Sequence, residues 1–128
     1  MVSRVGIVGL GMAVTPHARS LLDLKDRVQV ACAYSPTPAR REAFSAKFPF
    51  PLTDRLETIL DDRSVNAVLV LTPPNTHMEL VQRCAVAGKH VLLEKPLEIS
   101  TPRAEQLVGS TKGLKLAICL QHRFRPAA

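Results

Sequence analysis

Two glycines one residue apart, Gly9 and Gly11, lie near the start of the chain, between a short apolar run and a segment of helical periodicity. Gly9 permits a tight turn, and Gly11 lets the backbone come close to an anionic group. The free N–H groups at the start of the next helix would then face a diphosphate. The pattern predicts a dinucleotide site at this turn. Val14 stands where a third small residue is usual, which indicates a looser or differently angled helix, and a plain structural turn is the alternative.

Glu94, Lys95 and Pro96 directly follow another apolar run and form the second group of residues with chemical potential. A lysine at the mouth of a buried strand costs desolvation energy unless something uses it. Beside a bound cofactor, such a lysine can hold a substrate hydroxyl and help to move its proton, so we predict Lys95 to be catalytic. Pro96 fixes the local backbone, and the bond before it can be cis. A surface ion pair between Glu94 and Lys95 is the alternative.

The segment from Tyr34 to Arg41 should report which dinucleotide is bound. An acidic residue at the end of the second strand would bind the ribose hydroxyls of NAD and repel the phosphate of NADP. This end carries no acid, whereas Ser35 and Thr37 can donate hydrogen bonds and Arg40 can add a charged clamp. We therefore predict NADP as the preferred cofactor and NAD as the other. The alternative is a polar loop capped by Thr37, with arginines that point into solvent.

The elements that must position these residues alternate along the chain. Apolar, β-branched runs predict strands at 4–8, 28–34, 50–53, 65–71, 90–93 and 114–120. Helical periodicity and capping residues predict helices at 12–24, 38–47, 54–60, 76–87 and 100–110. This alternation predicts an α/β fold: a doubly wound, mostly parallel sheet with right-handed crossovers, the three-layer αβα arrangement of a Rossmann domain over residues 1–128.

In such a sheet the carboxyl ends of the strands face the crevice that holds the ligand. The loop after the fourth predicted strand therefore lies on the same side as the glycine turn and Lys95. This loop has the sequence Leu71-Thr72-Pro73-Pro74-Asn75-Thr76-His77, and we expect it to border the crevice. Capping of the next helix would explain Asn75 and Thr76 as well, and His77 could simply be exposed.

Composition argues against a nucleic-acid-binding, membrane-spanning or disulfide-rich protein. The net charge is +6, but the basic residues are spread along the chain and aromatic residues make up only 4%, too few for base stacking, so we expect no nucleic-acid partner. The apolar runs are too short for a membrane span, and the N-terminus lacks a leader pattern. Cys32, Cys84 and Cys119 are odd in number and widely spaced, which argues against a disulfide framework or a metal site. We interpret them as reduced core thiols of a cytoplasmic protein.

Four motifs together resemble the Gfo/Idh/MocA oxidoreductases: Gly9-Leu10-Gly11, Thr72-Pro73-Pro74-Asn75-Thr76-His77, Glu94-Lys95-Pro96 and Gln121-His122-Arg123-Phe124. The resemblance implies that the pyrophosphate is held by Gly9, Leu10, Gly11, Met12 and Ala13, and the adenosine ribose by Ser35 and its neighbours. It implies that the path to the nicotinamide is lined by Thr72, Pro73, Asn75 and His77. It further implies that Lys95 is the catalytic lysine and that Glu94 contacts the nicotinamide ribose. Gln121 stands where the family commonly has Asn, which leaves its contact open, while Arg123 keeps the pattern.

The same resemblance implies a substrate domain that this 128-residue chain lacks. Hydride transfer needs both walls of a site, so we expect cofactor binding with little or no turnover from this chain by itself. The family acts on sugars, polyols and related hydroxylated or carbonyl compounds, and a homo-oligomer is expected. A non-catalytic NAD(P)-binding sensor is the alternative, and Lys95 discriminates because a sensor has no need of it.

Overall fold

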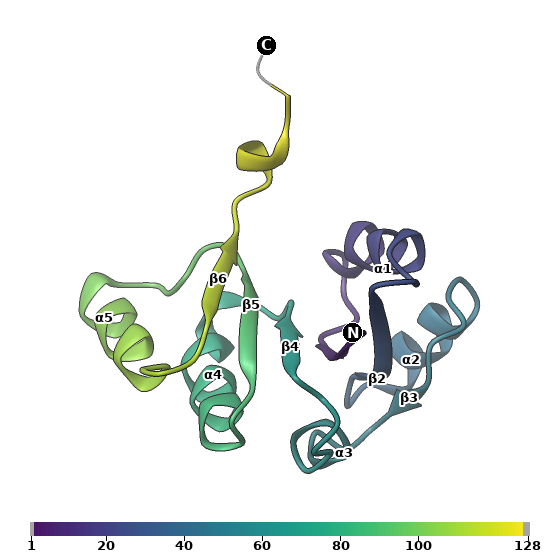
Figure 1. Ribbon diagram of the computed structural model, residues 1–128, viewed down its shortest axis with the longest axis horizontal. Helices are drawn as coiled ribbons and strands as arrows, with labels where there is room; N and C mark the ends of the chain where they lie inside the picture. The colour runs from purple at the N-terminus through teal and green to yellow at the C-terminus, as the bar shows by residue number, and fades with distance from the viewer. Residues whose placement is uncertain (1, 127–128) are drawn as a thin grey trace.

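The computed structural model describes residues 2–126, which build a single six-stranded parallel sheet between helices (Figure 1). Its strand order is β3-β2-β1-β4-β5-β6, and every neighbouring pair is parallel. The strands are β1 (Ser3–Val8), β2 (Val28–Tyr34), β3 (Leu52–Thr53), β4 (Ala67–Val70), β5 (His90–Glu94) and β6 (Leu116–Cys119). The order reverses between β1 and β4, which is the switch point of a Rossmann sheet and confirms the predicted fold class.

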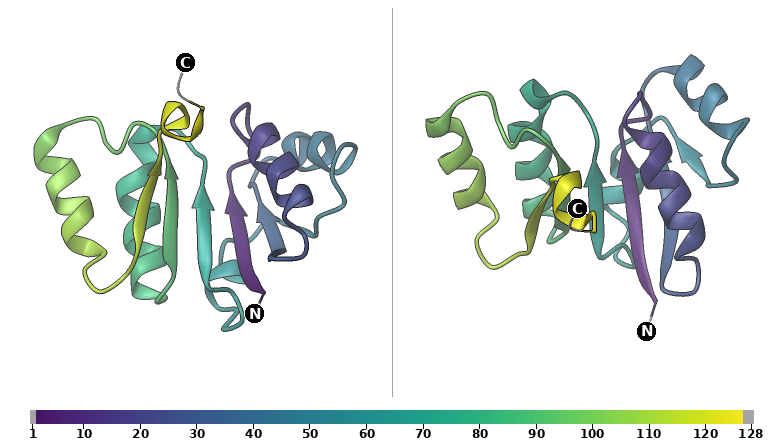
Figure 2. Two further views of the ribbon diagram at one scale, coloured as in Figure 1. Left: turned by 45° about the horizontal axis from the view of Figure 1, so that its top comes forward. Right: turned by 90° about the horizontal axis from the view of Figure 1, so that it is seen from above.

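Helices cover both faces of the sheet (Figure 2). The α-helices are α1 (Val14–Asp23), α2 (Pro38–Ser45), α3 (Glu57–Leu60), α4 (His77–Val86) and α5 (Thr101–Ser110). Two short 3₁₀ helices, η1 (Pro74–Thr76) and η2 (Gln121–Phe124), were not anticipated from the sequence. Ser100 caps α5 as expected, because its hydroxyl accepts a hydrogen bond from the N–H of Arg103 at 3.4 Å.

Alternation along each strand sends side chains into two separate cores. Val8 and Leu93 belong to the core under α3, α4 and α5, where Ile59 and Val81 are completely buried. Ile7 belongs to the opposite core under α1 and α2, which Phe44 and its aromatic neighbours complete. Burial on both faces explains why β1 and β4 read as continuous apolar runs.

Several predicted details were wrong. Helix α1 begins at Val14 rather than at residue 12, because residues 11–13 still belong to the turn. Thr37 precedes α2 without a side-chain capping bond. The Thr76 hydroxyl does not cap α4, since it lies 2.7 Å from Pro73 O and 2.6 Å from the Thr72 hydroxyl and bonds to these instead. Cys119 is only half-buried, unlike the two core thiols.

Within residues 2–126, no helix is both long enough and apolar enough to span a bilayer.

Candidate functional site

Two adjoining cavities lie at the carboxyl ends of the strands, where the parallel sheet brings together loops that are far apart in sequence. Their volumes are about 420 and 340 Å³. Both are lined by Gly9, Arg40, Thr72 and Pro73, so they form one continuous site across the switch point. A larger cavity of about 570 Å³ is lined by residues of the α3–α4 region such as Leu60, Gln82 and Val86, away from the glycine turn.

The first cavity combines the glycine turn with the end of β5. Gly11, Met12 and Ala13 form one wall, and Glu94 and Lys95 form another. Leu71, Thr72, Pro73 and Pro74 complete the lining from the end of β4. Leu10, by contrast, points away from the cavity and is buried in the core beneath α1. The turn and the lysine thus face the same space, as the order of the strands predicted.

The backbone of the turn requires glycine at position 9. Its φ is +104°, a left-handed value, and its N–H donates to Tyr34 O at 3.0 Å. A Cβ on Gly9 would lie 2.9 Å from Cγ2 of Thr72, so the turn also packs directly against the loop after β4. At Gly11 the surroundings are open, because a Cβ would meet only the Arg40 guanidinium, at 3.6 Å. Gly9 therefore shapes the turn, whereas Gly11 leaves room for a ligand.

The second cavity is bordered by the end of β2 and the start of α2. Ser35 and Thr37 line it together, and the Ser35 hydroxyl accepts a hydrogen bond from the Thr37 N–H at 3.2 Å. The two arginines play different parts here. Arg41 donates to Ser35 O at 2.7 Å and so holds the loop, whereas the exposed Arg40 lines both cavities.

Lys95 was expected to be desolvated at the mouth of a buried strand, and Glu94 to be its possible ion-pair partner. The structure shows neither arrangement. Lys95 is exposed, since the cavity is open at this edge, and its placement therefore carries no burial cost. Glu94 does not form the alternative surface ion pair with its neighbour: its Oε2 lies 3.1 Å from Nε2 of His17 on α1. The Lys95–Pro96 peptide bond is cis.

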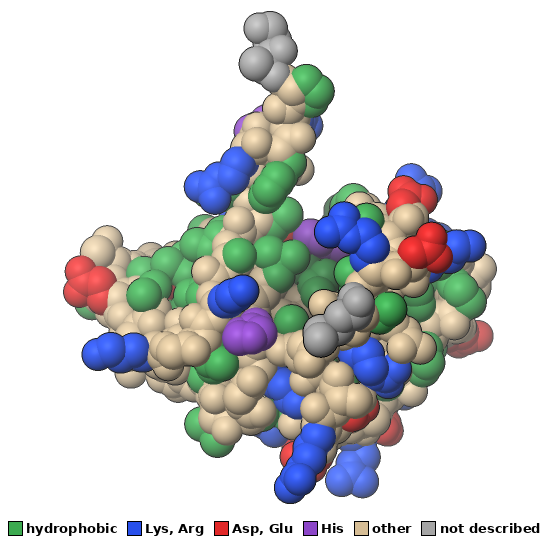
Figure 3. Space-filling view, in the orientation of Figure 1, with side chains coloured by type: hydrophobic (Ala, Val, Ile, Leu, Met, Phe, Trp, Pro, Cys, Tyr) green, Lys and Arg blue, Asp and Glu red, His purple; other side chains and the backbone are tan. Residues whose placement is uncertain are grey.

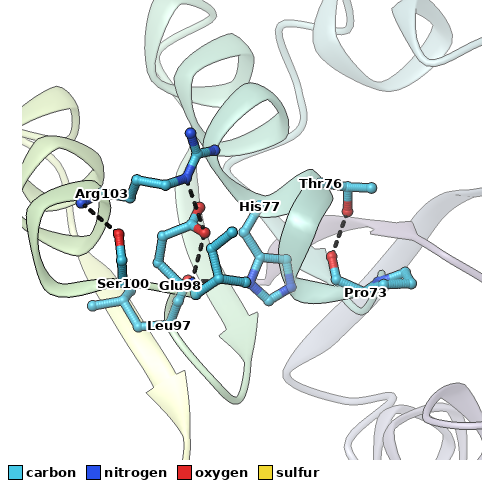
Figure 4. Close-up of polar contacts among 8 residues, drawn as sticks. Pro73, Thr76, His77, Leu97, Glu98, Ser100 and Arg103 are labelled. Atoms are coloured by element: carbon cyan, nitrogen blue, oxygen red, sulfur yellow. Dashed lines mark hydrogen bonds and ion pairs between the residues drawn. The ribbon is translucent and has the colours of Figure 1, made fainter.

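The loop that follows Lys95 is held to α5, as Figure 4 shows. Arg103 of α5 pairs with the Glu98 carboxylate at 3.3 Å, and the N–H of Ile99 donates to the same carboxylate at 2.7 Å. The bond from Ile99, with Arg103 adding to it, holds the pKa of Glu98 below its usual value. These contacts fix the chain just beyond the catalytic candidate.

His77 is completely buried and connects two loops of the site (Figure 4). One ring nitrogen, Nε2, lies 2.8 Å from Thr72 O, and the other, Nδ1, lies 3.2 Å from Leu97 O. The alternative that this side chain is merely exposed is therefore wrong. His77 lines neither of the two cavities. In this structure it instead supports the loops after β4 and β5.

Replacing His77 with alanine should lower the free energy of unfolding by about 2–4 kcal/mol, because the change leaves a cavity and removes the ring N–H that donates to one of the two facing carbonyls. Urea denaturation of the two proteins measures this difference. His122→Ala is the matched control, since His122 is exposed on η2 and its loss should leave the denaturation midpoint unchanged. Equal midpoints for His77→Ala and the unmodified chain would contradict the supporting role.

Three further candidates lie outside the cavity linings. Asn75 is exposed on η1, and Gln121 and Arg123 are exposed on η2, which extends away from the sheet. Their contacts with a cofactor stay predictions.

The sequence analysis missed His17, because its hydrogen bond to Glu94 spans 77 positions of sequence. Cys119 lies beside Glu94 on the neighbouring strand; burial, and then the charge of Glu94, raises the pKa of its thiol.

This arrangement has counterparts among known proteins. The sequence model of the Gfo/Idh/MocA family, described as an oxidoreductase family with an NAD-binding Rossmann fold, matches residues 3–122. The chain belongs to the Gfo/Idh/MocA oxidoreductase family. Within that family it forms the Rossmann domain, as the sequence resemblance implied.

Similar proteins of this family include characterised dehydrogenases and reductases. The myo-inositol 2-dehydrogenase of Thermotoga maritima is 34% identical over 109 residues, which cover 85% of this chain and 33% of the relative. The NADP(+)-dependent scyllo-inositol 2-dehydrogenase of Bacillus subtilis is 32% identical over 94% of this chain and 34% of its own length. The 3-ketoreductase KijD10 of Actinomadura kijaniata, solved with NADP and TDP-benzene, aligns with a TM-score of 0.82 at 30% identity, over 96% of this chain and 40% of that one. The chain thus spans about a third of the length of these relatives.

Proposed function

We propose that this chain is the cofactor-binding half of an NAD(P)-dependent oxidoreductase that transfers hydride to or from a sugar, polyol or related hydroxylated or carbonyl compound. The observation that carries the proposal is the shared cavity of the glycine turn and Lys95. Two similar proteins are named as inositol dehydrogenases, and a third is a ketoreductase crystallised with NADP. These names support the same function.

The two cavities suit the two ends of a dinucleotide. We place the pyrophosphate at the backbone of residues 9–13, where α1 presents its N-terminus. The adenosine end lies in the cavity of Ser35 and Thr37, and the nicotinamide end lies beside Glu94 and Lys95. A bound nicotinamide supplies the hydride donor or acceptor. In the reducing direction the Lys95 ammonium would donate a hydrogen bond and then a proton to the reacting oxygen of the substrate; in the oxidising direction the neutral Lys95 amine would accept the hydroxyl proton.

Arg40 supports a preference for NADP, since it lines both cavities and no acidic residue follows β2. Arg40→Ala should weaken NADPH binding at least about tenfold and NADH binding much less, because a charge-assisted hydrogen bond to the 2′-phosphate contributes roughly 1.5–3 kcal/mol. Calorimetric titration with both nucleotides measures the two changes. Arg19→Ala, at an exposed position of α1, is the matched control. Equal losses for NADPH and NADH would instead assign Arg40 to the pyrophosphate.

We further propose that turnover requires a second domain, which supplies the other wall of the substrate site, and that the enzyme forms a homo-oligomer in the cytoplasm. The chain covers only about a third of its relatives. Apolar side chains gather near the base of the extended C-terminal segment in Figure 3, and Ile99, Leu120 and Phe124 are 63%, 46% and 71% exposed. Such a surface suits a covering domain or subunit. The three free thiols agree with a reducing compartment.

A further inference from the structure

Three potential metal ligands meet on the side of the sheet that faces α1. Glu94 and Cys119 are direct partners in the parallel register of β5 and β6, so their side chains lie next to each other on one face. His17 reaches them from α1, with its Nε2 at 3.1 Å from Oε2 of Glu94. The nitrogen, oxygen and sulfur atoms of the three side chains all lie within 4.8 Å of one another.

We propose that His17, Glu94 and Cys119 form a binding site for a divalent transition-metal cation, with Zn²⁺ as the best match. Imidazole, carboxylate and thiolate are the three ligand types that zinc takes in proteins, and sites with three protein ligands keep a fourth position open. The inference revises the sequence-based expectation of no metal site. That expectation relied on cysteine spacing, whereas these ligands come from three elements and only the folded sheet brings them together.

The geometry and charge of the cluster both fit such an ion. Zinc bonds of about 2.0–2.3 Å in a tetrahedron separate ligand atoms by roughly 3.5 Å, so the present spacing needs only a small side-chain adjustment. All three side chains are half-buried, which limits competition from water without closing access. As the Zn–S bond forms, the Cys119 proton passes to solvent, and the thiolate and the Glu94 carboxylate then balance the two positive charges of the ion.

The position of Glu94 gives this site a consequence for the cavity. Glu94 lines the first cavity together with Lys95, so a cation bound to its carboxylate would lie close to the space around the lysine. The metal site itself does not depend on the proposed oxidoreductase function, because all three ligands are present in the chain without any nucleotide.

Cobalt(II) titration of the chain, freed of any affinity tag and without nucleotide, tests the site directly. We expect one equivalent of Co²⁺ to produce the near-ultraviolet absorption of a cobalt–thiolate bond, and one equivalent of Zn²⁺ to displace it. Cys119→Ser should abolish this absorption. His17→Ala and Glu94→Gln should each lower the affinity at least about tenfold, since even residues that only orient metal ligands contribute that much.

Two matched variants control for the other thiols and imidazoles. Cys32→Ala removes a thiol in the core, His122→Ala removes an exposed imidazole, and both should retain the absorption and the stoichiometry. Thermal unfolding confirms that Cys119→Ser is folded, and Cys119→Ala provides a second variant if it is not. Absence of the absorption in the unmodified chain, or its persistence in a folded Cys119 variant, would overturn the proposal. A normal nucleotide titration in the same sample would leave the proposed function intact.

Discussion

Replacing Lys95 with alanine in the full-length protein should reduce turnover by roughly 10²–10⁴-fold, which is the usual contribution of a positioned general acid or base. Nucleotide affinity should change much less, because we assign the lysine to the reacting oxygen of the substrate and the backbone turn to the nucleotide. Steady-state kinetics with an inositol or a related polyol, combined with calorimetric nucleotide titration, separate the two effects. Lys95 is exposed, so the substitution should leave stability unchanged.

Lys112→Ala is the matched control for this experiment, since Lys112 is an exposed lysine that lines neither cavity at the strand ends. It should retain full activity. Equal turnover of the unmodified protein and Lys95→Ala would remove the lysine from the mechanism. If the full-length protein instead binds nucleotide but turns over no polyol or sugar, the chain would be better described as an NAD(P)-binding sensor.

Gly11→Val should weaken the binding of both NADPH and NADH at least about tenfold, because the added side chain would occupy the space through which the backbone approaches the diphosphate. The unfolding midpoint should hardly change, since a Cβ at this position meets only the Arg40 guanidinium at 3.6 Å. Calorimetric titration with each nucleotide and urea denaturation measure the two quantities.

The contrast with Gly9 makes position 11 the cleaner test. A side chain at Gly9 would meet Thr72 at 2.9 Å and force a left-handed φ on an L-residue, so stability and binding would fall together. Gly109→Val, on an exposed part of α5 with open surroundings, provides the matched glycine control. Nucleotide affinity of Gly11→Val equal to that of the unmodified chain would contradict the assignment of the turn.

Local sequence determined much of this fold. The run from Val28 to Tyr34 was predicted with the bounds that the structure shows, because a strand buried in a parallel sheet is almost wholly apolar. The convergence of Gly9, Thr72 and Lys95 followed from topology alone, since all parallel strands end at one edge. These parts of the site depend on order along the chain and not on individual side-chain contacts.

The parts that could not be predicted depend on contacts between distant elements. His77 was expected to contact the cofactor or to be exposed, but it is buried between the backbone carbonyls of Thr72 and Leu97. The contact of His17 with Glu94 joins α1 to the end of β5 across 77 positions of sequence, which no local pattern encodes. Gln121 and Arg123 follow a family motif, yet η2 carries them beyond the two cavities, where only further chain or a bound ligand could engage them.

The proposed function requires a dinucleotide to lie across the strand ends, with its diphosphate on the turn and its nicotinamide beside Lys95. Backbone amide NMR of the isotopically labelled chain, titrated with NADPH, can locate the bound nucleotide residue by residue. We predict saturable shifts of the amides of residues 9–13, of Ser35 and Thr37, and of Glu94 and Lys95. Shifts confined to the α3–α4 cavity around Leu60 and Val86, or no shifts at millimolar NADPH, would contradict the claim.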